Sequence, residues 1–260
     1  MSGQDLLIKT VGRTSRITIN RPHVMNALNW SVMNDLEAAF DRLADDDVRT
    51  VIVTGAGDKA FVAGADIEEL QKLASGEDAL RWARFGQAVF AKIEHFPKPV
   101  IMAINGYCLG GGCELALAGD VRIASEHAKF GQPEIDLGIS PGWAGTQRLP
   151  RLIGKARAKL LIFTGAHIDA HEALRIGLVD EVVPSDQLLS RAEELGETLA
   201  AKAPVALRLA KESINLSSEV GLEYGCAVEA AYFAVECKTE DRLEGTTAFL
   251  EKRKPVFKGR

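Results

Sequence analysis

The stretch 100–120, VIMAINGYCLGGGCELALAGD, constrains the fold more than any other part of the chain. Its first five residues are apolar, too few for a typical helix, and they lie between Pro99 and Asn105-Gly106, so they predict a buried strand. Three glycines follow, and then the helix-forming residues 113–118. A strand, a glycine turn and a helix start present backbone N–H groups at the positive end of a helix. There they can stabilise a developing negative charge.

A second unit of the same kind precedes it. Residues 51–57, VIVTGAG, read as a strand and a glycine turn like residues 100–106, VIMAING, and a stretch of small residues follows each. Two such units can bring bare N–H groups to one shared ligand. Strand patterns are concentrated before about residue 135 and helical patterns after it. The chain therefore predicts an α/β fold with a β-rich core and a helical C-terminal part.

Hydrophobic periodicity places the other elements. A helix is expected after residues 26–29, ending at 45–47, with its apolar face at Val32, Leu36, Ala39, Phe40 and Leu43. Another is expected over 77–96, where we interpret Trp82, Phe85, Val89, Ile93 and Phe96 as core packing. Further strands are expected at 6–10, 16–20, 121–124 and 179–183, an extended segment at 130–134, and helices at 145–154, 155–165, 169–176 and from 186 onward.

Charge and cysteine usage exclude several classes of function. The net charge of −5 argues against a nucleic-acid or membrane-surface partner, and we interpret the basic cluster 252–254 as a solvated tail. The four cysteines lack the paired spacing of a zinc site, so thiols in a reducing cytosol and no bound metal are expected. The first residues carry no targeting pattern, and no apolar stretch approaches a membrane span. A soluble, cytoplasmic protein is expected.

Three familiar functional motifs can be excluded. The glycines 110–112 do not continue into G-x-G-x-x-G, which argues against a dinucleotide site. Residues 171–175, HEALR, have Arg175 where a zinc-binding helix needs its second histidine. Residues 138–142 fit G-x-S-x-G, but Pro141 follows Ser140 and cannot supply the N–H that such a serine nucleophile needs.

Two glutamates remain as candidates for chemistry. Glu114 lies in an otherwise apolar helix that should be buried, and a buried carboxylate is costly unless it is paired, hydrogen-bonded or functional. Glu134 follows Pro133 in a turn after a strand, a position where loop residues often carry chemistry. Either glutamate alone would be interpreted as a solvated surface residue.

Four segments together resemble the crotonase superfamily, and within it the enoyl-CoA hydratases. They are FVAGADIEEL (61–70), NGYCLGGGCELALAGD (105–120), FGQPEIDLGISPGWAGTQRLPRLIG (130–154) and EALRIGLVDEVVP (172–184). The similarity extends from Arg21-Pro22 and residues 26–28 to FLEKRKPVF at 249–257, so it covers essentially the whole chain.

The resemblance implies a fold and an assembly. Residues 1–195 would form a crotonase-like spiral of ββα repeats that carries the active site. Residues 196–260 would form a C-terminal helical region that makes a trimer, with trimers commonly pairing into hexamers, and that completes the coenzyme A site. The substrate would be an acyl-CoA thioester, and no separate cofactor is implied because coenzyme A is part of that substrate.

The resemblance also implies roles for individual residues. The N–H groups of Ala65 and Gly111 would form the oxyanion hole for the thioester carbonyl, and Glu114 and Glu134 would be the acid/base pair. The backbone of Gly142 would help to place the water. Contacts to coenzyme A would come from Ala27, Ala63, Ala65, Asp66 and Ile67, and from Lys252, which an adjacent subunit could supply.

The chemistry of these residue types agrees with reversible hydration of a 2-enoyl-CoA to a 3-hydroxyacyl-CoA, as in fatty-acid β-oxidation. Water adds to a C=C bond only when the thioester oxygen can hold the negative charge of an enolate, and two N–H donors supply that stabilisation. A base must activate the water and an acid must protonate Cα. Family isomerases tend to use one carboxylate near the position of Glu134, so having both favours hydration.

Two alternatives stay open at this point. One is another crotonase-fold reaction, either double-bond isomerisation or hydration of a cyclic or dienoyl thioester. The other is a non-catalytic scaffold that binds coenzyme A or RNA, against which both glutamates and the acidic net charge argue. Trp143 stands where hydratases usually have a small residue. Its indole either packs between helices or shapes the acyl pocket.

Overall fold

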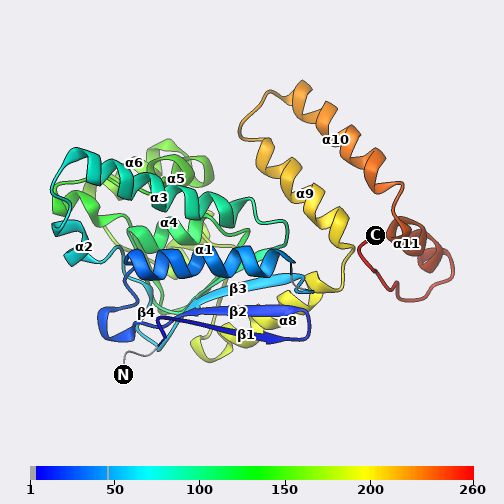
Figure 1. Cartoon of the computed structure of the whole chain (residues 1–260), viewed down its shortest axis with the longest axis horizontal. Coiled ribbons are helices and arrows are strands. Elements are labelled where there is room, and N and C mark those ends of the chain that lie inside the picture. The colour runs from blue at the N-terminus through cyan, green and yellow to red at the C-terminus, as the bar shows by residue number, and fades with distance from the viewer. Residues whose placement is uncertain (1–3, 46) are drawn as a thin grey trace.

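The strands form two sheets in the computed structural model, which describes residues 4–45 and 47–260 (Figure 1). The six-stranded sheet has the order β1 (Leu6–Val11), β2 (Thr14–Ile19), β3 (Thr50–Gly55), β5 (Val100–Ile104), β7 (Val121–Ser125), β10 (Glu181–Val183). The four-stranded sheet has the order β4 (Ala60–Val62), β6 (Tyr107–Leu109), β8 (Lys129–Gly131), β9 (Ile168–Asp169). In the larger sheet β1 and β2 pair antiparallel, and the other neighbours pair parallel.

Most predicted strands are confirmed with shifts of one or two residues at their ends; the last, for example, begins at Glu181 rather than at 179. One prediction needs correction. The segment expected to be extended over 130–134 stops being a strand at Gly131, and the 3₁₀ helix η2 (Pro133–Leu137) follows. Proline is favoured in the first turn of a helix because its missing N–H has no partner to lose there. Glu134 therefore lies on a short helix.

Successive turns of the chain add one strand to each sheet and then a helix. β3 and β4 lead to α2 (Ile67–Gln71) and α3 (Gly76–Glu94), β5 and β6 lead to α4 (Gly111–Leu117), and β7 and β8 lead to η2. This confirms the expected spiral of ββα units. Because β4, β6 and β8 are neighbours in the smaller sheet, the segments that follow these three strands meet at one edge.

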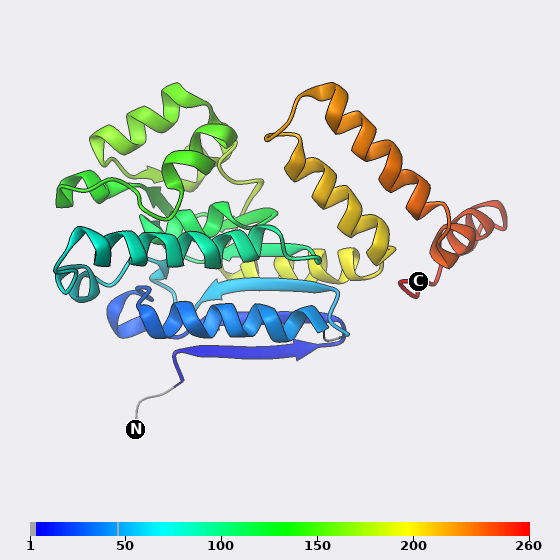
Figure 2. The ribbon, with the colours of Figure 1, turned by 45° about the horizontal axis from the view of Figure 1, so that its top comes forward.

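Helices cover both faces of the larger sheet (Figure 2). α1 (Trp30–Asp45) and α3 pack with alternate strand residues such as Val53 and Met102, whereas α8 (Leu188–Ala200) packs with the intervening ones such as Ile52 and Ile101. Neighbouring residues of a strand point to opposite faces, which gives the two apolar layers. The predicted apolar face of α1 is buried at every position. The expected end of α1 includes Asp46, which lies outside the described residues, as do residues 1–3.

The last three helices lean away from the rest of the molecule (Figures 1 and 2). They are α9 (Pro204–Leu216), α10 (Leu222–Glu236) and α11 (Glu240–Leu250). The division expected at 195/196 falls inside α8, which packs on the sheet, so the projecting part begins at α9. None of the described helices is both long and apolar enough to cross a membrane. The remaining elements are η1 (Pro22–Val24), α5 (Gly145–Ile153), α6 (Lys155–Thr164), α7 (Ala170–Arg175) and η3 (Ser185–Gln187).

Candidate active site

A cavity of about 610 Å³ lies where the segments after β4, β6 and β8 meet. Its walls come from the stretch after β4, from α2 and α3, from the start of α4, and from η2 with the loop that leads to α5. Most of the predicted site residues line it: Ala63, Ala65, Ile67, Gly111, Glu114, Glu134, Gly142 and Trp143. Residues up to 80 positions apart in sequence therefore share one small space.

Two backbone N–H groups in this cavity, those of Ala65 and Gly111, have positions that glycines make possible. Each follows a glycine with positive φ, 126° at Gly64 and 50° at Gly110, a conformation that other residues rarely adopt. A methyl group built on Gly111 would lie 3.4 Å from the nitrogen of Ala65, so the two residues are in contact. Within the described chain, neither N–H donates to a backbone acceptor. Both are free to bind a ligand oxygen.

Glu114 is held by the backbone of the loop before α5. Its side chain is buried, and its Oε1 accepts from the N–H of Trp143 at 2.8 Å and from the N–H of Gly145 at 2.7 Å. The residue between these donors, Ala144, has a φ of 82°, the left-handed conformation that aims both N–H groups inward. Burial raises the pKa of Glu114 to about 7. The negative charge of Glu134 adds to this rise, and the two backbone donors oppose it.

Glu134 is held by a side chain that the sequence analysis did not single out. With its amide nitrogen facing the carboxylate, the buried Gln132 donates to Oε1 at 2.8 Å and to Oε2 at 3.0 Å. A methyl group on Gly110 would lie 3.2 Å from Oε1 of Glu134, so this carboxylate lies over the glycine turn that leads to Gly111. Burial raises the pKa of Glu134 to about 7.

The matched pKa values determine what the pair can do. Two neighbouring carboxyl groups that both titrate near pH 7 are able to share a proton at neutral pH, so that one is an acid while the other is a base. The two free N–H groups lie in the same cavity and can stabilise negative charge on an oxygen. The arrangement fits proton transfer at carbons next to a carbonyl group.

Three predicted contacts to coenzyme A lie outside the cavity lining that the structure describes: Ala27, Asp66 and Lys252. Asp66 forms an ion pair with Arg21 at 3.0 Å and caps α2 through the N–H of Glu68. The carbonyl of Ala27 accepts from the same Arg21 side chain at 2.6 Å. Lys252 follows α11, which lies at the opposite end of the molecule from α2 (Figure 1).

Trp143 packs between helices and also reaches the cavity, so its position is compatible with both interpretations. The side chain is buried between α3 and α4, and it also lines the cavity. Trp82, which we interpreted only as core, lines the cavity beside it. Gly142 lines the cavity too, and its carbonyl accepts from the side chain of Gln87 at 2.8 Å. Among the described residues, no cluster of three histidine, cysteine or acidic side chains is able to hold a metal ion.

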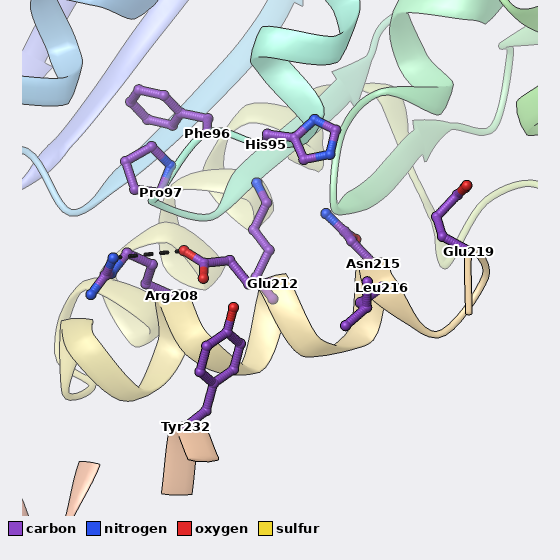
Figure 3. Close-up of a pocket in the computed structure, with 10 residues that line it drawn as sticks. His95, Phe96, Pro97, Arg208, Glu212, Asn215, Leu216, Glu219 and Tyr232 are labelled. Atoms are coloured by element: carbon purple, nitrogen blue, oxygen red, sulfur yellow. Dashed lines mark ion pairs between the residues drawn. The ribbon is translucent and has the colours of Figure 1, made fainter. Parts of the chain in front are cut away.

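A second cavity, of about 180 Å³, lies between the end of α3 and helices α9 and α10 (Figure 3). Arg208 pairs with Glu212 there at 3.7 Å, and the hydroxyl group of Tyr232 faces Glu212. Lys211, which also lines this cavity, pairs with Asp120 at 2.8 Å. Neither Glu114 nor Glu134 lines this space, so the candidate chemistry belongs to the larger cavity.

Known proteins that resemble this chain match it over nearly its whole length. A family model described as enoyl-CoA hydratase/isomerase matches residues 11–260. The short-chain-enoyl-CoA hydratase of Clostridium acetobutylicum is 44% identical over 255 residues, covering 98% of this chain and 97% of that protein. The crotonyl-CoA hydratase of Syntrophomonas wolfei is 45% identical over 258 residues, covering 99% of each. The crystal structure of enoyl-CoA hydratase from Bacillus anthracis superposes with a TM-score of 0.95 at 42% identity, covering 99% of this chain and 100% of that one.

Proposed function

The chain belongs to the enoyl-CoA hydratase/isomerase family, and from that premise we propose that it is an enoyl-CoA hydratase, a lyase. It adds water reversibly across the 2,3 double bond of a 2-enoyl-CoA thioester and forms a 3-hydroxyacyl-CoA. One observation supports this most strongly. Two free N–H groups and two carboxyl groups with pKa values of about 7 line the same cavity.

The N–H groups of Ala65 and Gly111 bind the thioester oxygen. As the water oxygen bonds to C3, negative charge moves through the conjugated system onto the thioester oxygen, and an enolate forms. Donors that are already in place stabilise that charge without reorganising, and one such donor is typically worth about 3–4 kcal/mol of activation free energy. The glycines at 64 and 110 supply the backbone conformations that hold both donors in position.

Glu114 and Glu134 move the protons. One carboxylate takes a proton from water as the water oxygen attacks C3, and the other carboxyl group gives a proton to C2. In dehydration the same groups act with their roles exchanged, so a pair with pKa values of about 7 serves both directions. The backbone of Gly142, in the same cavity lining, helps to place the water.

The thioester and the adjoining part of coenzyme A lie along residues 63–67, of which Ala63, Gly64, Ala65 and Ile67 line the cavity. Ala27 and Asp66 support this segment through Arg21, which contacts both of them. The protein needs no other cofactor for this reaction, because the activating thioester belongs to the substrate. We place the protein in the cytoplasm and its reaction in β-oxidation of fatty acids.

The projecting helices support assembly into a trimer, with trimers pairing into hexamers. α10 buries none of its residues within one chain, although most of its side chains are apolar. Leu222, Phe233, Phe249 and Leu250 are between 65% and 85% exposed, which is unusual for residues of this type. In the trimer the helices after α8 would bring Lys252 of one subunit toward the coenzyme A phosphates of another. A native mass of three or six times 28.1 kDa is the expected result.

A direct assay tests the proposed activity. Crotonyl-CoA incubated with the protein should lose its enoyl absorbance, and the product should be 3-hydroxybutyryl-CoA by mass spectrometry. A product with an unchanged mass and a migrated double bond would indicate an isomerase instead. No reaction with any 2-enoyl-CoA, although the protein binds acyl-CoA, would contradict the proposal.

A further inference from the structure

The indole of Trp143 lies in a seat formed by two glycines. Its side chain is only 3% exposed. A methyl group built on Gly86 of α3 would overlap its Cδ1 and Nε1 atoms, and a methyl group built on Gly111 would lie 2.6 Å from its Cζ3 atom. Both approaches are closer than any ordinary carbon contact. A side chain at either glycine would therefore displace the indole.

A hydrogen bond holds the indole against α3. Its Nε1–H donates to the carbonyl of Trp82 at 3.3 Å, and that carbonyl lies one helical turn before Gly86. A glycine inside a helix costs about 1 kcal/mol relative to alanine, so Gly86 has a local cost that its packing must offset. The rings of Trp82 and Phe90 meet the indole edge to face, with centroids 5.0 Å and 5.6 Å away. Gly86 lets the indole reach the helix backbone.

A displaced indole can move toward the cavity. Gly86 and the rings of Trp82 and Phe90, all on α3, bound the indole on one side, and Gly111 bounds it on another. Trp143 and Trp82 line the cavity together, next to Glu114 and to the small residue Ala83. A shift of the indole by 1 Å would therefore take volume from the space in which an acyl group must lie.

We propose that Trp143, seated by Gly86, is the end wall of the acyl site and restricts the protein to short acyl groups. This inference rests on the proposed function. The indole touches Gly111, whose N–H binds the thioester oxygen, and its backbone N–H binds Glu114, so the wall lies close to the reacting carbons. An acyl chain that extends past C3 meets the indole within a few methylene groups. Four-carbon chains fit, and eight-carbon chains do not.

Binding of saturated acyl-CoA esters tests the proposal without requiring turnover. The ratio of the Kd for octanoyl-CoA to the Kd for butyryl-CoA is measured by calorimetry on the wild type and on Trp143→Ala. The ratio should fall at least ~10-fold in the variant, because each methylene group that gains burial contributes roughly fourfold. Trp143→Leu, which leaves a smaller apolar filling, should shift the ratio in the same direction by a smaller factor.

Gly86→Ala should move the same ratio the opposite way. The added methyl group displaces the indole toward the cavity. The Kd for octanoyl-CoA should therefore rise at least ~3-fold more than the Kd for butyryl-CoA, about the effect of one lost methylene contact. Gly76→Ala is the matched control in the same helix, because a methyl group there meets nothing within 4 Å. In the double variant Gly86→Ala/Trp143→Ala, the ratio should equal that of Trp143→Ala alone, since the effect of residue 86 acts through the indole.

The failures are distinguishable. A ratio within twofold of the wild type in both Trp143→Ala and Trp143→Leu would overturn the end-wall proposal, whatever the protein catalyses. An effect of Gly86→Ala that persists without the indole would overturn the role of Gly86 as its seat. If the variants show the predicted changes in binding but the wild type does not hydrate crotonyl-CoA, the proposed function is contradicted instead.

Discussion

Glu114 lies on α4 with 2% of its surface exposed, whereas Glu134 lies on η2 and is only partly buried. Backbone N–H groups hold the first, and a side-chain amide, that of Gln132, holds the second. Both pKa values nevertheless rise to about 7, because burial is the largest cause in each case. Two different sets of contacts thus surround two carboxyl groups with the same raised pKa. Changes of backbone shape should disturb the first carboxylate, and changes of side chain should disturb the second.

Removing either carboxyl group gives the largest expected effect. In Glu114→Gln and in Glu134→Gln, kcat for crotonyl-CoA hydration should fall by at least ~10²-fold, since each variant loses one partner of the proton transfer. The double variant should lose much less than the product of the single losses, because the two groups act as a unit. Glu197→Gln, on the exposed side of α8, is the control. Equal activity in the wild type and either site variant would contradict the paired acid and base roles of Glu114 and Glu134.

The pH dependence of stability should show the cost of ionising the buried Glu114. Its folded-state pKa of about 7 lies above the usual value near 4.5, so the folded protein binds more protons between these pH values. The free energy of unfolding of the wild type should therefore fall as pH rises from about 4.5 to 7. Glu114→Gln removes the part of this slope that comes from Glu114, whereas Glu134, with a pKa also of about 7, keeps its own part. The variant should be more stable above pH 7 by up to about 3 kcal/mol. Urea titrations at pH 5 and pH 8 measure the difference; an identical slope in the variant would mean that Glu114 titrates normally.

A change at Gly145 should act on Glu114 and also on Gln132, which holds Glu134. A methyl group there would lie 2.8 Å from the side-chain amide of Gln132 and 3.0 Å from both Cγ and Oε1 of Glu114, although the N–H that binds Oε1 is kept. We expect Gly145→Ala to lower kcat about 10-fold while stability changes by about 1 kcal/mol. Gly221→Ala, where the added methyl group meets nothing within 4 Å, is the matched control. Wild-type kcat in Gly145→Ala would show that the carboxylate does not need this position.

Replacing Gln132 should act on Glu134 and give the smallest change in rate. Gln132→Leu removes two donors that stabilise the ionised carboxylate, so the pKa of Glu134 should rise further. The pH optimum of kcat/KM should move to higher pH by about 1 unit, with a loss of a few-fold at pH 7. The pH profile separates this positioning role from a purely structural one, which would lower activity equally at all pH values.

The sequence predicted the parts of the molecule that depend on local periodicity. The apolar spacing of α1, the short apolar strands and the buried position of Glu114 among Cys113, Leu115 and Ala116 were all confirmed. A charged residue inside an apolar run is a strong local signal, because its burial follows from its neighbours. The family resemblance also assigned Ala65 and Gly111 to one site, and both residues line the same cavity.

Other features of the site arise only from tertiary packing. Nothing in the sequence marks Ala144 as left-handed, yet its φ of 82° aims the N–H groups of Trp143 and Gly145 at Glu114. Gln132 has no periodic or charge signal that separates it from any polar loop residue. Trp82 belongs to a helical stripe that is mostly core, and its second contact, with the cavity, depends on the loop around Trp143. Such contacts join segments about 60 residues apart.

A structure of the protein with bound butyryl-CoA tests the central claim most directly. The account predicts the thioester oxygen within about 3.1 Å of both the Ala65 and Gly111 nitrogens, with C2 and C3 between the carboxyl groups of Glu114 and Glu134. A thioester oxygen bound away from these two N–H groups, or an acyl chain that reaches only one of the two glutamates, would contradict it.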